Sequence, residues 1–446
     1  MYIKLIQPRM KPRPMDTEIK LHMAPPLGLL TIASLLKKEH RVEIENENIE
    51  KIRFDDQPDL VGISVTVDVY NRACEIASAF MEKGVCVVAG GIHITTAWES
   101  IPENRFSALS IGCAEGTWPT ILKDFSEGRL KKRYFCAEDF RGEEIVSPDY
   151  ERIPKRKYLY NNVVHTSRGC PYRCDFCYNS AKRRMYLNRP IEDVVSDIRK
   201  IGLKHIMFID DNFAGNRAWT EAFLKRITPM KIKWNAAVSL DAAKDMHLLD
   251  LMKESGCRSL FIGFESINED SVSAVHKHQN RREDYENAVR EIHKRGIMIN
   301  ASFVFGLDAD TKETFSRTVD WIVKNKIETV TSHILTPYPG TALYNRMRAE
   351  GRILTEDLSL YNTAHVVFRP RGMSEKELYD GYLKVYKSVY SLKNIIKRLP
   401  EERSQRVTYL LFNLLYRKYG RFTDFLCRRV GYETIGRLAQ KIAKYI

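Results

Sequence analysis

Three cysteines lie close together in the segment RGCPYRCDFCYNS: Cys170, Cys174 and Cys177. Clustered thiols in a reducing compartment bind metal or carry out redox chemistry more often than they form disulfides. A structural zinc site needs four nitrogen or sulfur ligands, usually as two close pairs far apart in the sequence. The segment has no fourth cysteine. His165 could be recruited, but a ligand five residues before Cys170 is unusual for a zinc module.

An iron-sulfur cluster is the second interpretation of the three thiols. A cube of four irons and four sulfides has four iron corners, and three thiolates in one short loop can hold three of them. The fourth iron is then open to a ligand that takes part in chemistry. The spacing therefore favours a [4Fe–4S] cluster with one open coordination position.

The composition limits the other classes of protein. Hydrophobic residues make up 44% of the chain and charged residues 29%, which is typical of a folded globular protein. The chain shows neither a leader-like apolar run nor a stretch long and apolar enough to span a bilayer, so we expect a cytoplasmic location. The net charge of +14 is compatible with nucleic acid, an anionic lipid surface or an acidic substrate. A nucleic-acid partner is disfavoured, because no RNA-binding platform, helix-turn-helix or zinc-finger pattern accompanies the charge.

The frame that positions the cysteines begins with residues 1–142, which alternate short apolar runs with amphipathic segments. Runs rich in valine and isoleucine between amphipathic helices predict βαβ units and a parallel sheet. We therefore expect an α/β, doubly wound, Rossmann-like domain. Ligands bind such sheets beyond the carboxyl ends of the strands, here the turns at 64–66, 90–93 and 112–116. Two of these turns contain glycines, which permit a ligand to approach the backbone closely.

A charged segment broken by prolines, residues 143–160, predicts a linker. A second alternating series follows over residues 161–373 and predicts a (β/α)6 partial TIM barrel, whose working face is again the carboxyl ends of its strands. The expected strands lie near residues 163–166, 205–210, 231–239, 259–265, 298–305 and 329–335. The expected helices lie near residues 191–201, 218–227, 243–255, 282–295 and 312–324.

Residues 374–446 predict helices only, and these helices are basic, aromatic-rich and amphipathic. We favour a helical subdomain that covers one end of the barrel. The alternative is contact with the inner membrane surface or with a hydrophobic substrate, because Lys and Arg beside Tyr, Phe and Leu also suit an interfacial helix.

The cysteine spacing, with Phe176 just before the last thiol and a predicted strand before the first, resembles the radical S-adenosylmethionine (SAM) superfamily. The resemblance implies that the amino and carboxylate groups of SAM chelate the open iron. It also implies that an electron from the reduced cluster cleaves a carbon–sulfur bond of SAM and yields a 5′-deoxyadenosyl radical. An electron donor such as flavodoxin or ferredoxin is then an expected partner.

Two further motifs resemble SAM-binding segments of this family. FIDDNF, after the second strand, contains Asp210, Asp211 and Asn212, which are similar to a variant, found in cobalamin-linked members, of the turn that holds the methionine amino group. Alternation along a strand lets only one of the two aspartates point inward, and the sequence does not decide which. IGFES resembles the motif that binds the ribose, through Glu265, and the alternative is a carboxylate at a helix N-terminus.

The last two strands carry weaker matches. FVFGLDADTKET resembles the adenine-contacting segment, in which backbone around Phe305 and Gly306 would edge the base. TPYPGTALY resembles the loop after the sixth strand, although a plain Pro-Gly turn would look the same. No acid–base pair is found, so no catalytic residue beyond the cofactor ligands is predicted.

The doubly wound region before the barrel, with VAGGIHITT at a strand end, resembles the cobalamin-binding domain of cobalamin-dependent radical SAM proteins. No Asp-x-His-x-x-Gly motif occurs, so no histidine of that motif can replace the nucleotide base beneath cobalt. We expect His93 to form a hydrogen bond in the cofactor pocket rather than to ligate cobalt. The other candidates for lining the cobalamin pocket, which could instead be simple strand-to-helix turns, are Ser64, Thr66, Gly90, Gly91, Gly112 and Glu115.

Together these resemblances imply a class B radical SAM C-methyltransferase with a [4Fe–4S] cluster, SAM and cobalamin as cofactors. One SAM would methylate cobalamin, a second would be cleaved at the cluster, and the methyl group would pass through methylcobalamin to an unactivated carbon after hydrogen abstraction. The alternatives are a non-methylating cyclase or rearrangement enzyme of the tetrapyrrole cyclase type, a non-catalytic iron-sulfur protein, and a zinc-bound nucleic-acid-binding module. The C-terminal helices resemble those of relatives that act on lipids such as hopanoids and on tetrapyrroles, which predicts a small hydrophobic or anionic substrate.

Overall fold

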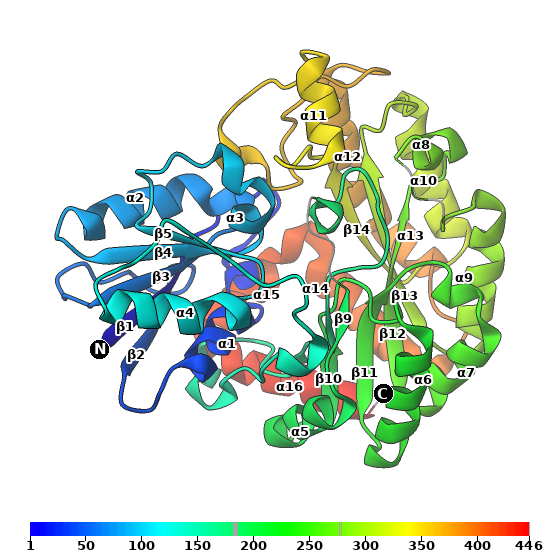
Figure 1. The fold of residues 1–446 in the computed structure, drawn as a ribbon. Coiled ribbons are helices and arrows are strands. Elements are labelled where there is room, and N and C mark those ends of the chain that lie inside the picture. The colour runs from blue at the N-terminus through cyan, green and yellow to red at the C-terminus, as the bar shows by residue number, and fades with distance from the viewer. Residues whose placement is uncertain (182–185, 276, 278, 446) are drawn as a thin grey trace.

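The computed structural model describes residues 1–181, 186–275, 277 and 279–445. Two six-stranded sheets dominate it, with all neighbouring strands parallel. The N-terminal sheet lies on the left of Figure 1 and the second sheet on the right, and helices of residues 406–430 lie between them in this view. The expected α/β fold, with a doubly wound sheet, a partial barrel and a helical C-terminus, is confirmed.

The N-terminal sheet has the spatial order β2-β1-β3-β4-β5-β6. Its strands are β1 (Tyr2–Gln7), β2 (Arg41–Asn46), β3 (Leu60–Ser64), β4 (Cys86–Gly90), β5 (Ala108–Ile111) and β6 (Arg133–Phe135). The strand order reverses between β1 and β3, which is the switch point of a doubly wound fold. The two edge strands have weak sequence signals, because RVEIEN in β2 alternates charged and apolar residues and RYF in β6 is only three residues long.

Helices cover both faces of this sheet. α2 (Tyr70–Met81) and α3 (Ile92–Ala97) pack on one face, and α1 (Leu27–Leu35) and α4 (Ala114–Ser126) pack on the other (Figure 1). Phe80 fills the first interface and Trp118 the second, and both side chains are buried. Because both faces are covered, the inner strands are almost continuously buried.

The second sheet has the spatial order β14-β13-β12-β11-β10-β7 and forms an open barrel. Its strands are β7 (Val163–Val164), β10 (His205–Phe208), β11 (Lys233–Val238), β12 (Cys257–Glu265), β13 (Met298–Phe305) and β14 (Thr329–Ile334). A short antiparallel pair is formed by β8 (Ser167–Arg168) and β9 (Leu187–Asn188). The helices that follow the strands are α5 (Ile191–Ile201), α6 (Arg217–Ile227), α7 (Met246–Glu254), α8 (Glu269–Ser273), α9 (Tyr285–Lys294), α10 (Lys312–Lys324) and α11 (Ala342–Ala349).

The barrel strands alternate between buried and half-exposed residues. The buried set, which includes Trp234 and Phe264, packs against the outer helices. The half-exposed set, which includes Met207, Asn235 and Thr331, lies on the opposite, inner wall. The inner wall is therefore accessible and partly polar, unlike the packed interior of a closed TIM barrel.

The C-terminal helices are α12 (Glu375–Val389), α13 (Leu392–Lys397), α14 (Arg406–Tyr416), α15 (Arg421–Val430) and α16 (Tyr432–Tyr445). α12 covers the open edge of the barrel at β14. The hydroxyls of its Tyr386 and Tyr390 bond the backbone N–H groups of Ser332 and Val330 at 3.0 and 3.2 Å. These bonds satisfy donors that a sheet edge otherwise leaves unpaired. None of the described helices combines the length and apolarity needed to cross a bilayer.

Candidate active site

The three cysteines lie on the loop that follows β8, near the carboxyl ends of the barrel strands. Cys174 is buried, and Cys170 and Cys177 are half-buried. The side-chain amide of Asn212 lies 3.9 Å from the sulfur of Cys170, and that of Gln279 lies 3.7 Å from the sulfur of Cys174. Burial raises the pKa of all three thiols, that of Cys177 to about 12. Because a bound metal deprotonates coordinating thiols, a metal group would remove this protonation.

The spacing of the three sulfurs distinguishes a single ion from a cluster. Two thiolates on one zinc ion lie about 3.8 Å apart, since each Zn–S bond is about 2.3 Å long. Among the described residues, the ligand atoms of only one trio of acidic, Cys or His residues, Glu43 with Glu45 and Asp56, all lie within 4.8 Å of one another. The three cysteine sulfurs therefore do not all lie within 4.8 Å of one another. Three thiols on one loop, without a fourth cysteine in the segment, fit three corners of an iron-sulfur cube.

The cluster loop is held by two other connections of the barrel. The backbone N–H of Asp175 donates to the carbonyl of Val275 at 3.2 Å, and the carbonyl of Asp175 accepts from the N–H of Leu343 at 3.2 Å. The rings of Tyr178 and Tyr338 meet edge to face at 5.2 Å. Thus the TPYPG loop after β14 packs directly against the cysteine loop.

Phe176, the aromatic residue between the second and third thiols, is half-buried and packs against the barrel core. Its ring therefore anchors the loop to the barrel. A contact of this ring with SAM stays a prediction.

Asp210 and Asp211 take different roles at the end of β10. Asp210 is buried, and one of its oxygens accepts hydrogen bonds from the backbone N–H of Thr166 at 2.8 Å and from the hydroxyl of Ser167 at 2.7 Å. Burial raises the pKa of Asp210 to about 6. Asp211 is exposed and accepts hydrogen bonds from Asn179 and the backbone of Gly169 on the cysteine loop. Asp210 therefore fixes the turn before the loop, and Asp211 faces the loop itself.

Asn212 is buried between the cysteine loop and the end of β11. Its amide donates to the hydroxyl of Ser239 at 3.1 Å in addition to its contact with Cys170. The side chain thus links the loop to the barrel.

Glu265 adopts a left-handed backbone conformation, with φ of 62°, where the pairing of β12 with β13 shifts register. Its buried carboxylate forms an ion pair with Lys277, whose ammonium also lies 3.0 Å from the carbonyl of Gly263. Helix α8 begins four residues later and is capped by Asn268, so Glu265 is not a helix N-terminal carboxylate. A strained, buried acid at a strand end is typical of a binding site.

Lys277 is a site residue that the sequence motifs do not reveal. Its positive charge lowers the pKa of both Cys170 and Cys174, although burial outweighs this effect. The only signal for it is an isolated lysine between two histidines, which no spacing rule connects to Glu265.

Phe305 and Gly306 already have structural partners. The ring of Phe305 is buried against Phe315 at 5.0 Å, and its carbonyl accepts from the N–H of Leu335 at 2.8 Å. Gly306 has φ of 95°, and its N–H donates to the carboxylate of Asp310 at 3.0 Å. Contact of this backbone with adenine stays a prediction.

The glycine turns of the N-terminal sheet lie beside one another at the carboxyl ends of β3, β4 and β5. The N–H of Val65 donates to the carbonyl of Gly90 at 2.8 Å. Gly91 has φ of 105°, and an added Cβ would lie 2.8 Å from the backbone N and O of Val65. Gly112 has φ of 96° and donates to the hydroxyl of Thr95 at 3.1 Å. This edge is thus built from closely approaching backbone.

Some side chains at the carboxyl ends of these strands already form contacts with neighbouring residues. Ser64 ends β3, and the hydroxyl of Thr66 donates to the carboxylate of Asp68 at 2.6 Å. His93 is buried edge-on to Tyr70, with ring centroids 4.9 Å apart. Burial lowers the pKa of His93 to about 4, so the ring is neutral at pH 7.

Glu115, expected to line the cobalamin pocket, pairs with the barrel, and its contact with a cofactor stays a prediction. Its buried carboxylate receives two hydrogen bonds of 2.6 Å from the guanidinium of Arg168, the residue that opens the RGC segment. A second contact joins the same edges, because an added Cβ at Gly340 of the TPYPG loop would strike the carbonyl of Thr96 in α3. The carboxyl ends of the two sheets therefore face each other. Both contacts bridge the two sheets, which local patterns do not reveal.

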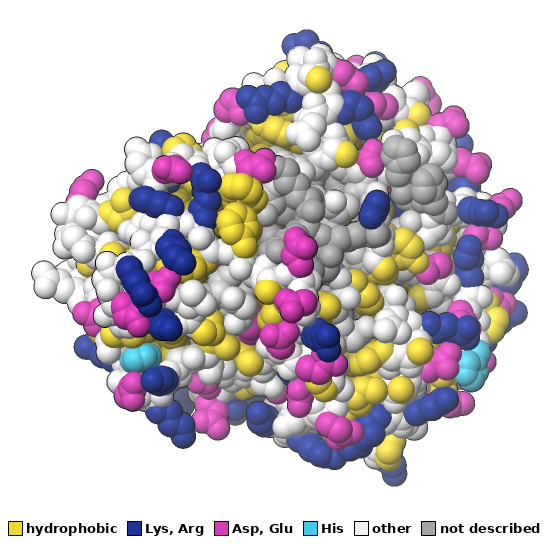
Figure 2. Space-filling model, viewed as in Figure 1, with side chains coloured by type: hydrophobic (Ala, Val, Ile, Leu, Met, Phe, Trp, Pro, Cys, Tyr) yellow, Lys and Arg dark blue, Asp and Glu magenta, His cyan; other side chains and the backbone are white. Residues whose placement is uncertain are grey.

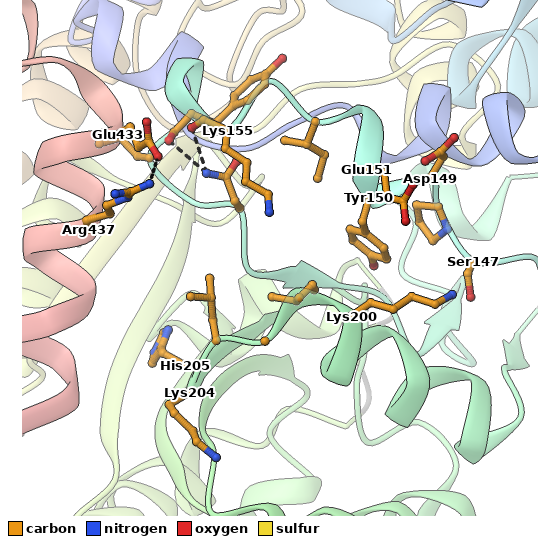
Figure 3. A pocket seen from close by; sticks show the side chains of 18 of the residues that line it. Ser147, Asp149, Tyr150, Glu151, Lys155, Lys200, Lys204, His205, Glu433 and Arg437 are labelled. Atoms are coloured by element: carbon orange, nitrogen blue, oxygen red, sulfur yellow. Dashed lines mark hydrogen bonds and ion pairs between the residues drawn. The ribbon is translucent and has the colours of Figure 1, made fainter.

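A cavity of about 1230 Å³ lies away from the cysteine loop (Figure 3). Its lining includes His205 and Lys233 at the amino-terminal ends of β10 and β11, together with Lys200 and Arg437. It is therefore at the opposite end of the barrel from the cysteine loop and takes no part in the candidate site.

The chain is similar to known protein families and to characterised enzymes. Residues 164–322 match the profile of the Radical SAM superfamily, and residues 341–408 match a domain of unknown function, DUF4070. Bacteriochlorophyllide d C-8(2)-methyltransferase of Chlorobaculum tepidum is 30% identical over 415 residues, which cover 88% of this chain and 91% of that protein. The chain belongs to the radical SAM superfamily. It is therefore an enzyme of a family whose cofactors are a [4Fe–4S] cluster and SAM.

Two solved structures share the fold over most of the chain. The cobalamin-dependent SAM radical enzyme OxsB matches with a TM-score of 0.67 and 16% identity, covering 100% of this chain and 79% of that one. The radical SAM methyltransferase TsrM of Kitasatospora setae matches with a TM-score of 0.62 and 19% identity, covering 78% and 75%. The arrangement of a doubly wound sheet before a partial barrel is thus shared with both.

Proposed function

We propose that this radical SAM enzyme is a cobalamin-dependent C-methyltransferase. The observation that carries the proposal is that the cysteine loop and the glycine-lined edge face each other and are joined by the ion pair of Arg168 with Glu115. Two methyltransferases of Chlorobaculum tepidum that act on bacteriochlorophyllide d, 30% and 27% identical to this chain, support the reaction type.

In this proposal Cys170, Cys174 and Cys177 would hold the cluster, which would bind SAM and supply the electron for its cleavage. Asp211, the exposed acid beside the loop, would take the amino group of SAM, and Glu265 would take the ribose hydroxyls. The ion pair with Lys277 holds the carboxylate of Glu265 in place. Asp210 would act indirectly, because its hydrogen bonds fix the turn that precedes the cysteine loop.

The N-terminal edge would hold the corrin. Its fit rests on the glycine turns, where Gly91 and Gly112 bring backbone to the surface without side chains. His93 is buried against the ring of Tyr70, which supports a role in shaping the pocket. When bound, the cluster supplies an electron for SAM cleavage, and the corrin supplies a methyl carrier.

The protein's own contribution is binding, orientation and exclusion of water. We place the substrate against the open inner wall of the barrel. That wall carries an exposed apolar side chain, Ile209, and polar ones such as Asn300 and His333, whose imidazole Nδ1 lies 3.0 Å from the hydroxyl of Thr363. Such a wall suits a hydrophobic molecule with polar substituents, of which tetrapyrroles and lipids are candidates. Flavodoxin or ferredoxin remains the proposed electron donor.

Cyclisation without methyl transfer is the second candidate. An anaerobic magnesium-protoporphyrin IX monomethyl ester cyclase of Cereibacter sphaeroides is 26% identical over 384 residues, which cover 77% of this chain and 61% of that protein. This cyclase and the methyltransferases match the chain to a similar extent, so methyl transfer and cyclisation must be distinguished by experiment.

Methyl-deuterated SAM separates them. The reconstituted enzyme is incubated under reducing, anaerobic conditions with tetrapyrrole and lipid test substrates, and products are analysed by mass spectrometry. We expect a product that has gained the deuterated methyl group, and we expect Cys174→Ala to abolish it. A substrate converted without gain of label would replace methyl transfer by cyclisation or rearrangement.

A further inference from the structure

The C-terminal helices combine positive charge with exposed apolar side chains. Residues 391–446 contain 13 Lys and Arg but only 4 Asp and Glu, so they carry +9 of the net charge of +14. Of the fourteen exposed large hydrophobic side chains in the described part of the chain, nine lie between Leu392 and Leu438. On the face of the molecule drawn in Figure 2, by contrast, Lys and Arg are interspersed with Asp and Glu.

Helix α14 has one anchored face and one free apolar face. Tyr409 and Asn413 are buried, and they donate to the carbonyls of Ile395 at 2.7 Å and Glu328 at 3.1 Å. On the opposite side of the helix, Val407 and Leu414 are 63% and 48% exposed. Side chains seven residues apart share one face of a helix, so these two form a single apolar strip.

Helix α15 repeats this arrangement with added charge. Its Asp424 and Cys427 are buried, and the carboxylate of Asp424 accepts from the N–H of Ile19 at 3.2 Å. The opposite face carries Phe422 and Phe425, which are 63% and 51% exposed. The guanidinium of Arg429 lies 5.0 Å from the ring of Phe425. Cations beside exposed aromatic rings on one face are typical of helices that lie in a membrane interface.

We propose that the outer faces of α14 and α15 dock on an anionic lipid surface. The apolar strips would enter the boundary between headgroups and acyl chains, and the basic side chains would contact the anionic headgroups. This proposal does not depend on the proposed function, because docking is measured without turnover.

Charge and apolarity together favour a lipid surface over a second copy of the chain or a nucleic acid as the partner of α14 and α15. A symmetric contact with a second copy of the chain would place two strongly basic faces against each other, which like-charge repulsion opposes. Nucleic acid would match the charge but would leave Phe422 and Val407 without an apolar environment. An anionic bilayer complements both the charge and the apolar strips.

Co-sedimentation with vesicles tests the proposal on the intact protein. We expect binding to vesicles of phosphatidylcholine with a quarter phosphatidylglycerol, weak binding to pure phosphatidylcholine, and partial release by salt. Phe422→Ser/Phe425→Ser is expected to lower partitioning by about tenfold or more. Arg421→Glu/Arg429→Glu is expected to lower it by about tenfold on the anionic vesicles alone.

Two matched controls change the same chemistry elsewhere. Phe135→Ser removes an aromatic ring that is 49% exposed on β6, and Lys37→Glu/Lys51→Glu makes the same change in net charge on the N-terminal region. Both controls should bind like the wild type, and far-UV circular dichroism should show that every variant is folded. Equal binding by the helix variants and their controls would overturn the proposal.

Tryptophan fluorescence gives a second, direct measurement of whether the outer face of α15 enters the bilayer. Phe425→Trp should show a blue-shifted emission on addition of the anionic vesicles, and brominated acyl chains should quench it. An unchanged spectrum would place the side chain outside the bilayer and contradict docking. Dimerisation without lipid that Phe422→Ser/Phe425→Ser abolishes, or tight RNA binding that Arg421→Glu/Arg429→Glu abolishes, would assign the surface to those partners instead.

Discussion

The two parallel sheets bury their strands differently, and this difference decides how each can hold a ligand. The inner strands of the N-terminal sheet are covered on both faces, whereas the barrel strands alternate between a buried outer side and an accessible inner side. A sheet covered on both faces offers a ligand only its edge, where backbone and turns dominate. An open barrel offers the side chains of its inner wall as well. The N-terminal sheet thus supplies glycine turns, and the barrel supplies thiols, carboxylates and amides.

The largest effect is expected from a side chain added at the carboxyl ends of the N-terminal strands. Gly91→Ala should lower the free energy of unfolding by about 4 kcal/mol, because the left-handed backbone and the contact with Val65 both oppose a Cβ. Urea unfolding measures the change. Gly28→Ala in α1, where an added Cβ meets no atom within 4 Å, is the control and should change stability by less than about 1 kcal/mol. Equal effects would show that the edge is not tightly built.

The second largest effect is expected from breaking the ion pair of Arg168 with Glu115, which joins the two sheets. Arg168→Met should cost about 3 kcal/mol, because it leaves the carboxylate of Glu115 buried without its cation. Adding Glu115→Gln should recover part of the loss. Arg226→Met, which breaks an exposed pair with Glu192, is the control and should leave the free energy of unfolding almost unchanged. A double-mutant cycle with no coupling would mean that the two edges are held together by other contacts.

Asp210 provides a pH-dependent test on the barrel side. Burial raises its pKa from 3.8 to about 6, so the folded state binds more protons between these values than the unfolded state does. Its contribution to stability therefore falls as pH rises from about 4 to about 6, by up to about 3 kcal/mol, and is constant above that. Asp210→Asn should remove this fall from the curve of unfolding free energy against pH. An unchanged curve would mean that Asp210 is ionised throughout.

The smallest expected effect concerns the edge of the open barrel. Tyr390→Phe should cost about 1 kcal/mol, because its hydroxyl bonds the N–H and the carbonyl of Val330 at 3.2 and 3.0 Å. Tyr379→Phe on the same helix is the control. Equal thermal denaturation curves for the two variants would show that α12 covers β14 by packing alone.

Much of the fold was predictable because the barrel and the doubly wound sheet have strong local signals. The expected ranges for β13, α5 and α10 agree with the structure at both ends. β2 escaped prediction because an exposed edge strand tolerates charge. β7 is shorter than expected, two residues, because the turn held by Asp210 begins at Thr166.

The site was predictable only where its residues are close in sequence. Three thiols within one loop give a local pattern, so they could be found. Glu115 and Arg168 are 53 residues apart, and their pairing depends on how the two sheets are placed. The separate roles of Asp210 and Asp211 likewise depend on which side of β10 meets the cysteine loop. Contacts of this kind arise from tertiary packing, which motif spacing does not encode.

The most direct test of the central claim is SAM cleavage at the three-cysteine loop. The wild type and Cys174→Ala are reconstituted anaerobically with iron and sulfide, reduced, and incubated with SAM, and metal content and nucleosides are measured. The account predicts about four irons per chain and formation of 5′-deoxyadenosine in the wild type, with loss of both in the variant. Stoichiometric zinc in place of iron, or a complete cluster that leaves SAM intact, would contradict it.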